Sequence, residues 1–587
     1  MTAKLYLLLM VYLTSCIHSN KKGPSSSSFP KGTNSSDRAF SATSEKGMIT
    51  SAHPLASRAG LNILKKGGNA VDAAVAVTMA ISVVRPQSTG IGGGGFLLHY
   101  DKRTGSILAY DFRETAPQNA SRDMYLDKNK EPKDFFYKGD RVPNASVNGH
   151  LSVATPGLIR GIWEVHQSHG SLPWKELFQD AIKLAQDGFV VYPNLEKAIN
   201  RRIKILNAFP STRKIFLPNG KVLGAGEILI QKDLAKTLIA IAEEGPDVFY
   251  RGWIAQKIVN EMKDGGGVLQ LEDLHNYQVK LRKPIESNFL DYTLFSMPPP
   301  SSGGVHVAQM LNMAEEADLE KEEHLSPEYI HTLVEIMRMA YADRAEYLGD
   351  SDFISVPVKG LISKDYAASL VEKIPRDKAG NSKDIGPGNP TQFESPSTTH
   401  FSIVDQWGNS VSSTQTINYG FGSGVVAEGT GIVLNDEMDD FSKKPGVPNA
   451  FGLVGSKANE IQPLKRMLSS MSPSFVFKDD ELDAVLGSPG GSRIINATLQ
   501  TIIHRYFLKM SPIESVHSTR IHHQWLPDKI FMEETSISLE TQDALRKMGY
   551  ELQESSFPIG DVQAIFREKN QWWGVSDTRS DGEPMAY

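Results

Sequence analysis

Cysteine is nearly absent from this chain, which has a single cysteine, Cys16, among its 587 residues. A disulfide within the chain is excluded because no second thiol exists to form one. Long apolar runs are also missing: the run from Leu5 to Leu13 is far shorter than the ~20 residues of a membrane-spanning helix. The chain lacks an excess of basic residues as well. Its net charge of −6 argues against nucleic acid as a partner.

The N-terminal segment has the features of an export signal. Lys4 precedes the short apolar run, as in the core of a signal peptide. Leu13-Thr14-Ser15-Cys16 resembles the processing box of bacterial lipoproteins, in which the cysteine becomes the lipidated N-terminus. We therefore predict a signal peptide with a lipid attachment site over residues 1–16. The protein is expected in the periplasm or at the cell surface, bound to a membrane through a lipid anchor only. The alternative is an ordinary signal peptide in which Cys16 has no role.

The remainder of the chain divides by composition and periodicity. Residues 17–45 are rich in Ser, Lys, Asn, Gly and Pro, which indicates a flexible tether. Apolar periodicity predicts helices over residues 53–66, 70–84 and 326–348, and strands over 96–100 and 106–113. Helices dominate the first portion, and strands lie on both sides of a polar linker over residues 388–397. This pattern predicts an α/β (α+β) protein with helices flanking a sheet core.

Thr398 follows that linker directly and begins the strand pattern Thr398-Thr-His-Phe-Ser-Ile-Val-Asp405. If the chain is cut between Ser397 and Thr398, the new α-amino group has a pKa near ~8 and accepts the proton of the threonine's own hydroxyl. This is the chemistry of N-terminal nucleophile hydrolases. A threonine at the start of a strand is ordinary by itself, so the prediction depends on the residues that follow.

Those residues predict a hairpin. Asp405-Gln-Trp-Gly-Asn409 is a turn signal, and residues 410–418 continue as a returning strand. If the turn centres near Trp407 and Gly408, the hairpin brings Thr416 and Asn418 back beside Thr398.

Further motifs appear in a characteristic order. They are Gly67-Gly-Asn-Ala-Val-Asp-Ala-Ala74, Thr89-Gly-Ile-Gly-Gly-Gly-Gly-Phe96, Gly420-Phe-Gly-Ser-Gly424, Gly431-Ile-Val-Leu-Asn-Asp-Glu-Met-Asp-Asp-Phe441, Leu468-Ser-Ser-Met-Ser-Pro473 and Gly487-Ser-Pro-Gly-Gly-Ser-Arg493. With Thr398, these motifs resemble γ-glutamyltranspeptidases (glutathione hydrolases) from about residue 53 to residue 587. The resemblance implies a four-layer αββα sandwich built from two fragments of one self-cleaved precursor. Residues 46–397 would form the large subunit and residues 398–587 the small catalytic subunit of a heterodimer, with no metal and no cofactor.

The same resemblance implies catalytic roles. Thr398 would attack the carbonyl of Ser397 during self-cleavage and later attack the substrate, while Thr416 orients its hydroxyl. Gly490 and Gly491 match the glycines of the oxyanion hole. Glycine lets two backbone N–H groups approach the developing oxyanion, and loss of one such donor costs about 3 kcal/mol.

A γ-glutamyl donor presents an α-carboxylate, an α-ammonium and a scissile amide, so its site needs a cation and an anion cluster. The resemblance assigns the carboxylate to Arg113, Ser469 and Ser470. It assigns the ammonium to Asn418, Glu437 and Asp440. Without the resemblance, Arg113 would be interpreted as a surface residue and the acidic run as a solvated turn.

Two other motifs have weaker functional interpretations. Gly90, Gly92 and Gly95 match G-x-G-x-x-G but precede an expected strand rather than a helix, which disfavours dinucleotide binding and favours close backbone packing near the active centre. The pairs His166/His169 and His522/His523 lack the spacing of metal sites, so they are expected to be surface or packing histidines.

We therefore expect a self-processing γ-glutamyltransferase and glutathione hydrolase. It would pass the γ-glutamyl group of glutathione or related compounds through a Thr398 ester to water, an amino acid or a peptide. One alternative is a cephalosporin acylase acting on a glutaryl donor, which has no α-ammonium. Another is an inactive, surface-anchored binding protein. Residues 443–460 resemble the lid loop of many bacterial members, with Phe451 where tyrosine is common.

Overall fold

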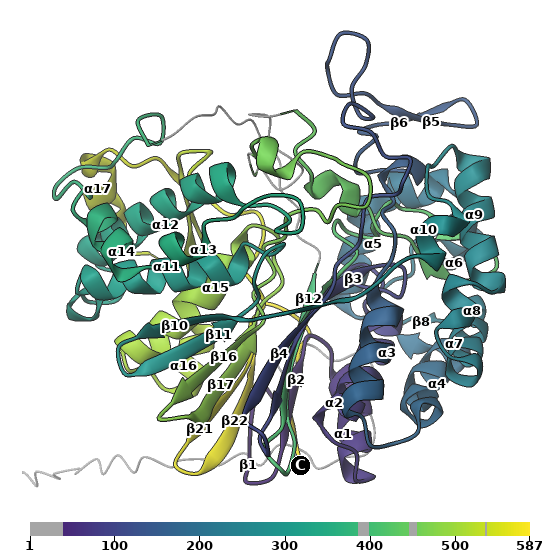
Figure 1. Ribbon diagram of the computed structural model, residues 1–587, viewed down its shortest axis with the longest axis horizontal. Coiled ribbons are helices and arrows are strands. Elements are labelled where there is room, and N and C mark those ends of the chain that lie inside the picture. Colours follow the sequence, from purple (N-terminus) through teal and green to yellow (C-terminus); the bar gives the residue numbers. More distant parts are fainter. Residues whose placement is uncertain (1–38, 386–397, 445–452, 454, 534–536) are drawn as a thin grey trace, which may run out of the picture. The chain divides into compact units, whose positions relative to one another are not determined.

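Two seven-stranded antiparallel sheets form the centre of the computed structural model (Figure 1). The structure describes residues 39–385, 398–444, 453, 455–533 and 537–587. All of these residues belong to one unit of the chain, Gly32–Tyr587. Within this described part, no helix has both the length and the apolar character needed to cross a bilayer.

The first sheet contains the strand that begins after Thr398. In spatial order its strands are β23 (Met585–Ala586), β2 (Met48–Ser51), β12 (Thr399–Val404), β13 (Ser410–Thr416), β3 (Gly94–Asp101), β4 (Ser106–Phe112) and β9 (Lys280–Arg282).

The second sheet is built mainly from the C-terminal part of the chain. In spatial order its strands are β1 (Ser41–Ser44), β22 (Gln571–Ser576), β21 (Gln563–Glu568), β17 (Glu481–Gly487), β16 (Ser474–Lys478), β11 (Tyr292–Ser296) and β10 (Ile285–Phe289). Smaller sheets are made by β5 (Phe135–Tyr137) with β6 (Asp140–Val142), β7 (Phe189–Val190) with β8 (Ile228–Leu229), β14 (Val426–Ala427) with β15 (Ile432–Val433), and β18 (Ile521–His522), β19 (Ile530–Met532) and β20 (Leu552–Glu554).

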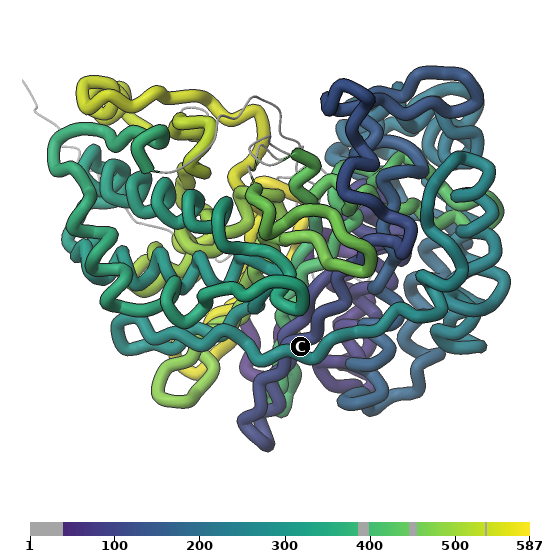
Figure 2. Tube along the Cα trace, turned by 45° about the horizontal axis from the view of Figure 1, so that its top comes forward, coloured from purple at the N-terminus to yellow at the C-terminus, as the bar shows by residue number. Residues whose placement is uncertain are grey.

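Helices cover the outer face of each sheet. On the first sheet lie α1 (Pro54–Lys65), α2 (Ala70–Val84) and α3 (Leu158–His169), followed outward by α4 (Gln179–Asp187), α5 (Pro193–Ala208), α6 (Pro210–Phe216), α7 (Lys232–Glu244), α8 (Asp247–Tyr250), α9 (Trp253–Gly265) and α10 (Leu271–His275). On the second sheet lie α11 (Gly303–Glu316), α15 (Arg493–Ile502) and α16 (Pro512–His517), with α12 (Pro327–Tyr347), α13 (Val358–Leu361), α14 (Lys364–Val371) and α17 (Leu539–Met548) beyond them. The chain passes from the first layer pair to the second between β9 and β10 (Figure 2). The predicted α/β class with four layers, αββα, is confirmed.

Helix α2 shows how the local sequence produces this arrangement. The side chain of Asn69 accepts hydrogen bonds from the N–H groups of Val71 and Asp72 at 2.9 and 3.0 Å, and the Asp72 carboxylate accepts from the N–H of Asn69 at 2.9 Å. This capping box starts the helix. Every residue of α2 is buried, because its small alanines and valines fit between the first sheet and the outer helices.

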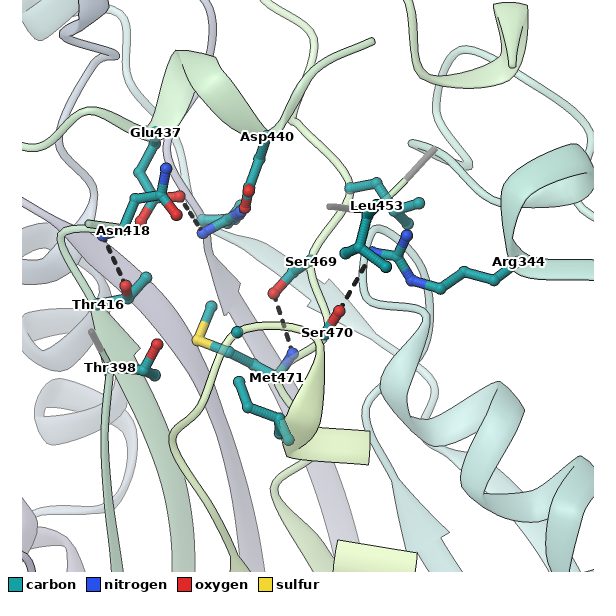
Figure 3. Close-up of a pocket in the computed structure, with 14 residues that line it drawn as sticks. Arg344, Thr398, Thr416, Asn418, Glu437, Asp440, Leu453, Ser469, Ser470 and Met471 are labelled. Carbon is teal, nitrogen blue, oxygen red and sulfur yellow. Dashed lines mark hydrogen bonds and ion pairs between the residues drawn. The ribbon is translucent and has the colours of Figure 1, made fainter. Parts of the chain in front are cut away.

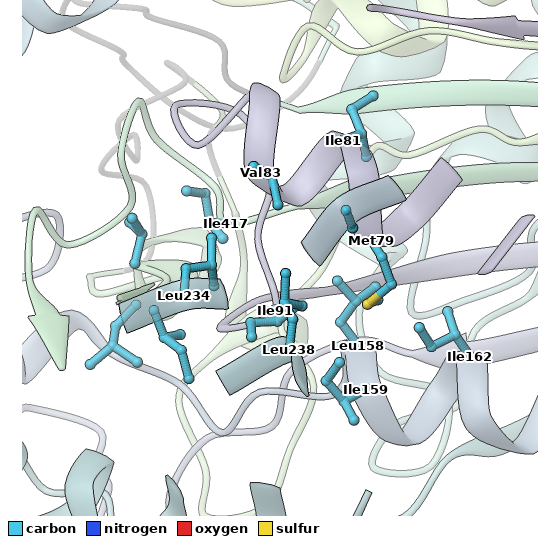
Figure 4. Packing of buried hydrophobic residues seen from close by; sticks show 14 of the residues in the cluster. Met79, Ile81, Val83, Ile91, Leu158, Ile159, Ile162, Leu234, Leu238 and Ile417 are labelled. Atoms are coloured by element: carbon cyan, nitrogen blue, oxygen red, sulfur yellow. The ribbon is translucent and has the colours of Figure 1, made fainter. Parts of the chain in front are cut away.

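The largest apolar cluster fills the space between the first sheet and its helices (Figure 4). It includes Met79 and Ile81 of α2, Leu158 of α3, and Ile417, the residue directly after strand β13. Another cluster lies between the two sheets, with Phe96 and Val404 from the first sheet and Phe475 and Ile565 from the second. The end of β13 is therefore anchored in a rigid core.

The predicted tether extends too far toward the C-terminus. Ser41–Ser44 lies in the expected tether of residues 17–45, yet it forms β1 and pairs with β22, with Ser41 opposite Val575. Polar composition suggested a tether, but backbone pairing along a sheet edge needs few apolar side chains. Ala42 also packs on the cluster between the sheets.

Candidate active site

Thr398 lies directly before β12, opposite the end of β13. The register pairs Thr399 with Gln415 and His400 with Thr414, so Thr416 is the residue across from Thr398. The predicted hairpin is confirmed. Figure 3 shows Thr398 and Thr416 next to each other at this end of the hairpin.

Strand alternation determines which face these side chains occupy. Phe401 and Ile403 of β12 pack toward the helices, whereas Val404 packs between the sheets. Because successive side chains point to opposite faces, Thr398 belongs with the residues that face the second sheet. The same face holds His400, whose Nδ1 lies 2.8 Å from the hydroxyl of Thr414.

The hydroxyl of Thr416 has a defined orientation. Its Oγ1 accepts a hydrogen bond from the N–H of Asn418 at 2.7 Å. Asn418 is itself held in place, since its side-chain nitrogen donates to the carbonyl of Asp436 at 3.1 Å. With its oxygen occupied as an acceptor, the Thr416 hydroxyl is suited to donate its proton toward a neighbour such as Thr398.

The glycines expected in the oxyanion hole lie in the loop between β17 and α15. Gly490 has a φ of 139° and Gly491 a φ of 57°, values that residues with a side chain rarely adopt. Their carbonyls accept hydrogen bonds from the N–H groups of Arg493 and Ile494 at 3.0 and 3.3 Å, at the start of α15. A helix N-terminus favours negative charge, so this loop is a suitable place to stabilise an oxyanion.

A small pocket collects the expected site residues from distant parts of the chain (Figure 3). We call it the donor pocket, and its cavity volume is about 20 Å³. It is lined by Arg113, Arg344, Thr398, Thr416, Asn418, Glu437, Asp440, Leu453, Leu468, Ser469, Ser470, Met471, Gly491 and Ile494. Of the ten described residues predicted for the site, only Gly490 is absent from this lining; it lines a neighbouring pocket that also contains Thr398. The other predicted positions, Ser397, Phe451 and Cys16, lie outside the described residues.

Arg113 lies at the centre of a buried charge cluster. Its Nη1 lies 2.6 Å from Glu437 and 3.7 Å from Glu114, and its Nη2 forms an ion pair with Asp440. Only 1% of the Arg113 side chain is exposed, so it is not the surface residue that its position after a strand alone suggested. Cation and anions of the predicted site therefore contact each other directly.

The acidic residues belong to a short 3-10 helix, Glu437–Asp440. Asn435 anchors this turn, since its side-chain nitrogen donates to the carbonyls of Gly92 and Ala154 at 2.8 and 2.9 Å. Its side-chain oxygen accepts from the N–H of Glu437 at 3.1 Å. These bonds bury an acidic run that would otherwise be a solvated turn.

Burial dominates the ionisation of this cluster. It raises the pKa of Asp440 to about 6, that of Glu114 to about 8 and that of Glu437 well above its usual range, although Arg113 opposes each rise. Burial lowers the pKa of Arg113, but Glu437 and Asp440 more than compensate and raise it overall. Three buried carboxyls thus share one guanidinium, and a second cation at this place would favour their ionised forms.

The opposite wall of the donor pocket has a buried cation, Arg344, without a carboxylate partner among the described residues. Arg344, from the last turn of α12, donates from Nε to the hydroxyl of Ser302 at 2.9 Å and from Nη2 to the hydroxyl of Ser470 at 3.1 Å. Burial lowers the pKa of Arg344 to about 10. Among the described residues, no carboxylate lies within 4.0 Å of its guanidinium. This end of the pocket therefore favours an anion.

Sequence reasoning missed Arg344. It lies in an ordinary helical pattern, and no local motif distinguishes it from a surface arginine. Ser469 and Ser470 were predicted. The loop after β11 holds the backbone of Ser469: its N–H donates to the carbonyl of Pro300 at 2.9 Å, and its carbonyl accepts from the N–H of Ser302 at 2.8 Å. The loop that carries Ser302 thus brings the two serines and Arg344 together.

The glycine-rich segment before β3 packs against the hairpin of β12 and β13. A Cβ added at Gly93 would lie 2.1 Å from the carbonyl oxygen of Thr416, and one at Gly95 would lie 2.5 Å from that of Thr414. The segment continues into strand β3 rather than a helix, which confirms that the G-x-G-x-x-G match is not a dinucleotide fingerprint. Side chains at these positions would push strand β13 away.

The histidine pairs serve packing. His522 and His523 are fully buried, and the Nε2 atoms lie 2.8 Å from Gln524 and 3.2 Å from Asp528, respectively. His166 is buried beside the carbonyl of Leu172 at 2.9 Å. These contacts agree with the expectation of packing histidines.

Comparison with known proteins agrees with this geometry. A sequence model of the family described as Gamma-glutamyltranspeptidase matches residues 56–587. The chain belongs to this family. It is 43% identical over 540 residues to the glutathione hydrolase proenzyme of Escherichia coli strain K12, covering 91% of each chain.

Solved structures show the same fold. The γ-glutamyltranspeptidase of Helicobacter pylori is 40% identical, with a TM-score of 0.54, and the match covers 57% of this chain and 94% of that one. A cephalosporin acylase from Bacillus halodurans is 27% identical, with a TM-score of 0.80, and the match covers 96% of this chain and 99% of that one. The fold is thus shared by both enzyme types, and the pocket has to distinguish them.

Proposed function

We propose that this γ-glutamyltranspeptidase family member is a self-processing γ-glutamyltransferase and glutathione hydrolase with Thr398 as its nucleophile. The observation that carries the proposal is the charge pattern of the donor pocket. One end, at Glu437 and Asp440, favours an additional cation, and the other, at Arg344 and Ser470, favours an anion. A γ-glutamyl group has an α-ammonium and an α-carboxylate that match these two ends.

Maturation uses the same nucleophile. The Oγ1 of Thr398 attacks the carbonyl carbon of Ser397, the peptide C–N bond breaks, and the nitrogen of Thr398 takes a proton, which leaves an ester. Water then hydrolyses the ester and releases a fragment that ends at Ser397 and one that begins at Thr398. The two fragments, one that ends at Ser397 and includes β1, and one of residues 398–587, remain together as a heterodimer because each contributes strands to both sheets.

Catalysis follows from the new N-terminus. The neutral α-amine of Thr398 accepts the proton of its own hydroxyl, and Oγ1 attacks the γ-carbonyl of the donor. The N–H groups of Gly490 and Gly491 stabilise the oxyanion, and Thr416 orients the nucleophile. The amine of the donor leaves with a proton, and water or the amine of an amino acid or peptide then resolves the γ-glutamyl ester. No step requires a metal or cofactor.

Donor recognition includes Arg344 in addition to the residues implied by the family. Arg113, Ser469 and Ser470 bind the α-carboxylate, with Arg344 holding Ser470 as an acceptor so that the serine's proton is directed to the donor. Asn418, Glu437 and Asp440 bind the α-ammonium. The contacts that support this assignment are the two hydrogen bonds of Arg344 and the ion pairs of Arg113.

A cephalosporin acylase activity is disfavoured by the same pocket. A glutaryl donor has no α-ammonium, so it would leave the buried carboxyls at Glu437 and Asp440 without the extra cation. An inactive binding protein is disfavoured because Thr398, Thr416 and the glycine loop are all in place around one pocket.

Self-cleavage provides the test of this function. Purified wild-type protein should give two bands on a denaturing gel, and mass spectrometry should place the N-terminus of the smaller fragment at Thr398. Thr398→Ala should remain a single chain without activity on a γ-glutamyl anilide, whereas Thr398→Ser should still cleave. A smaller fragment with any other N-terminus would falsify this mechanism.

Location is a separate part of the proposal. We infer that Cys16 carries lipid and that the enzyme is exported to the periplasm or cell surface, because the only cysteine follows Leu13-Thr14-Ser15 and precedes a polar segment. Several acyl chains would anchor it stably where one would not. Cys16→Ser should move the enzyme out of the membrane fraction without changing its specific activity. Wild-type enzyme that is unacylated and begins downstream of Cys16 would contradict the lipid anchor.

A further inference from the structure

A second pocket opens beside the nucleophile, and we call it the cationic pocket. Its cavity volume is about 500 Å³, against about 20 Å³ for the donor pocket. Thr398 lines both pockets, whereas Gly490 lines only this one and Gly491 only the donor pocket. The scissile bond of a bound donor therefore lies where the two pockets meet, and the group beyond that bond extends into the cationic pocket.

The walls of this pocket carry five cations and one carboxylate. Two of the cations have carboxylate partners. The guanidinium of Arg85 lies 3.5 Å from Asp561, and that of Arg579 contacts Glu533 and Asp577 at 2.5 and 2.9 Å. Their charge is largely cancelled within the protein.

The other three cations come from one face of helix α5. Lys197, Arg201 and Arg202 all line the pocket, and Lys197 and Arg201 are one helical turn apart. In the part of the chain that the structure describes, none of the three has a carboxylate within 4.0 Å. Like charges at this spacing repel each other, so the arrangement costs helix stability unless an anion approaches.

Aromatic rings hold the two guanidinium groups in place. The guanidinium of Arg201 lies 4.9 Å from the ring centre of Phe557, and that of Arg202 lies 5.0 Å from the ring centre of Tyr419. Stacking on a ring face leaves the N–H edge of a guanidinium available for a carboxylate. Arg202 is only partly available, because its Nη2 already donates to the carbonyl of Gly422 at 3.0 Å and its Nε, which has no hydrogen-bond partner among the described residues, is buried.

We propose that the cationic pocket selects the leaving group and the acceptor by negative charge, and that acidic peptides are its preferred acceptors. The inference rests on the proposed acyl transfer at Thr398 and adds the substrate class on the acceptor side. The α-amine of the acceptor attacks the carbonyl carbon of the γ-glutamyl ester. The new C–N bond forms as the C–O bond to Thr398 breaks, and the proton of the amine returns to Oγ1. Carboxylates further along the acceptor reach Lys197, Arg201 and Arg202.

Two dipeptides of nearly equal size show the effect of one acceptor carboxylate separately from the effect of acceptor size. The purified, self-cleaved enzyme is assayed with a γ-glutamyl anilide and either glycyl-glutamate or glycyl-glutamine as acceptor, at low salt. Wild-type enzyme should transfer to glycyl-glutamate with a kcat/KM about tenfold higher, a factor in keeping with close charge pairs at a partly exposed site. Raising the ionic strength to about 1 M shortens the screening length to about 3 Å, so the kcat/KM values for the two acceptors should become nearly equal.

Charge reversal on α5 should invert the preference. In Lys197→Glu/Arg201→Glu, glycyl-glutamine should become the better acceptor, while Arg201→Gln should reduce the wild-type ratio. Because each variant is judged by its own ratio, a general loss of activity does not affect the result. Lys183→Glu, on an exposed part of α4 outside the pocket, is the matched control and should keep the wild-type ratio.

Hydrolysis of the donor without any acceptor separates the two proposals. An enzyme that fails to hydrolyse the donor contradicts the proposed function itself. An enzyme that hydrolyses the donor but uses both dipeptides equally, or keeps its preference after charge reversal, overturns the assignment of the cationic pocket.

Discussion

The donor pocket and the cationic pocket share Thr398, yet their charges are arranged in opposite ways. In the donor pocket, Arg113 is buried and paired with Glu437 and Asp440, so cation and anions hold each other. In the cationic pocket, Lys197 and Arg201 are exposed and lack carboxylate partners among the described residues. Each pocket nevertheless borders the same residue, Thr398.

This contrast separates two kinds of recognition. Buried and mutually paired charges select a ligand whose own charges have a matching geometry, because an unmatched group would leave a buried charge without a partner. Exposed cations respond to the total charge of a ligand and are screened by salt. One side of Thr398 is therefore suited to a defined zwitterion, and the other to a range of anionic groups.

The largest effect is expected from Arg113→Ala, which removes the cation shared by three buried carboxyls. Breaking a buried pair from one side costs roughly 3–5 kcal/mol of unfolding free energy, and the donor loses its main carboxylate partner. We expect a lower unfolding midpoint in urea together with loss of donor turnover. Adding Glu437→Gln and Asp440→Asn should restore much of the stability but none of the activity. Restored activity in that triple variant would show that Arg113 has only a structural role.

Asp440→Asn is expected to weaken donor binding strongly while retaining more of the fold. The amide keeps the shape of the side chain but removes the charge that faces the α-ammonium. The fall in kcat/KM should therefore correspond to a loss of about 2 kcal/mol or more of transition-state stabilisation. Kinetics with a γ-glutamyl anilide measure this loss. The ratio between glycyl-glutamate and glycyl-glutamine should stay at the wild-type value, since that ratio depends on the other pocket. A changed ratio would mean that the two pockets are not independent.

The pH dependence should differ between the pockets as well. Burial raises the pKa of Asp440 to about 6, so this carboxyl becomes protonated, and loses its charge, as the pH falls through 6. Loss of the Asp440 charge should by itself lower donor kcat/KM about fivefold between pH 6 and pH 5, because the ionised fraction falls from about one half to about one tenth. In the pH profile of donor kcat/KM, the change near pH 8 that comes from the Thr398 amine should persist in Asp440→Asn. The change near pH 6 should disappear in this variant. The acceptor preference depends on the other pocket, so it should not follow this change in pH.

The smallest of these effects is expected from Arg344→Gln. The glutamine removes the charge that favours the α-carboxylate and one of the hydrogen bonds to Ser470 and Ser302. We expect a higher KM for the donor, equivalent to about 1 kcal/mol, with kcat little changed. Arg344→Lys should recover part of the affinity because it keeps the charge. An unchanged KM in Arg344→Gln would limit carboxylate recognition to Arg113 and the two serines.

Much of the fold could be predicted because its signals are local. The helix predicted over residues 70–84 begins and ends as predicted, since a capping box and an apolar run determine it within a few turns of chain. The hairpin of β12 and β13 follows from alternation and a turn at Asp405–Asn409, and these features place Thr416 across from Thr398. The limit of the tether was wrong because Ser41–Ser44 is a strand only through pairing with β22, some 530 residues away.

The sequence by itself predicted Thr398 as the nucleophile. It determined the strand that follows Thr398 and, through its motifs, the family and most of the residues that line the donor pocket. Only the tertiary structure decided which charges are paired and which remain available. Arg344 of α12 lines the donor pocket, and Lys197 and Arg201 of α5 line the cationic pocket. Long-range packing brings each of these helices to Thr398. Burial and the distance between charges depend on the whole fold, and they determine pKa and charge selectivity. A local pattern specifies a residue's secondary structure, but its electrostatic partners are specified only when distant segments pack together.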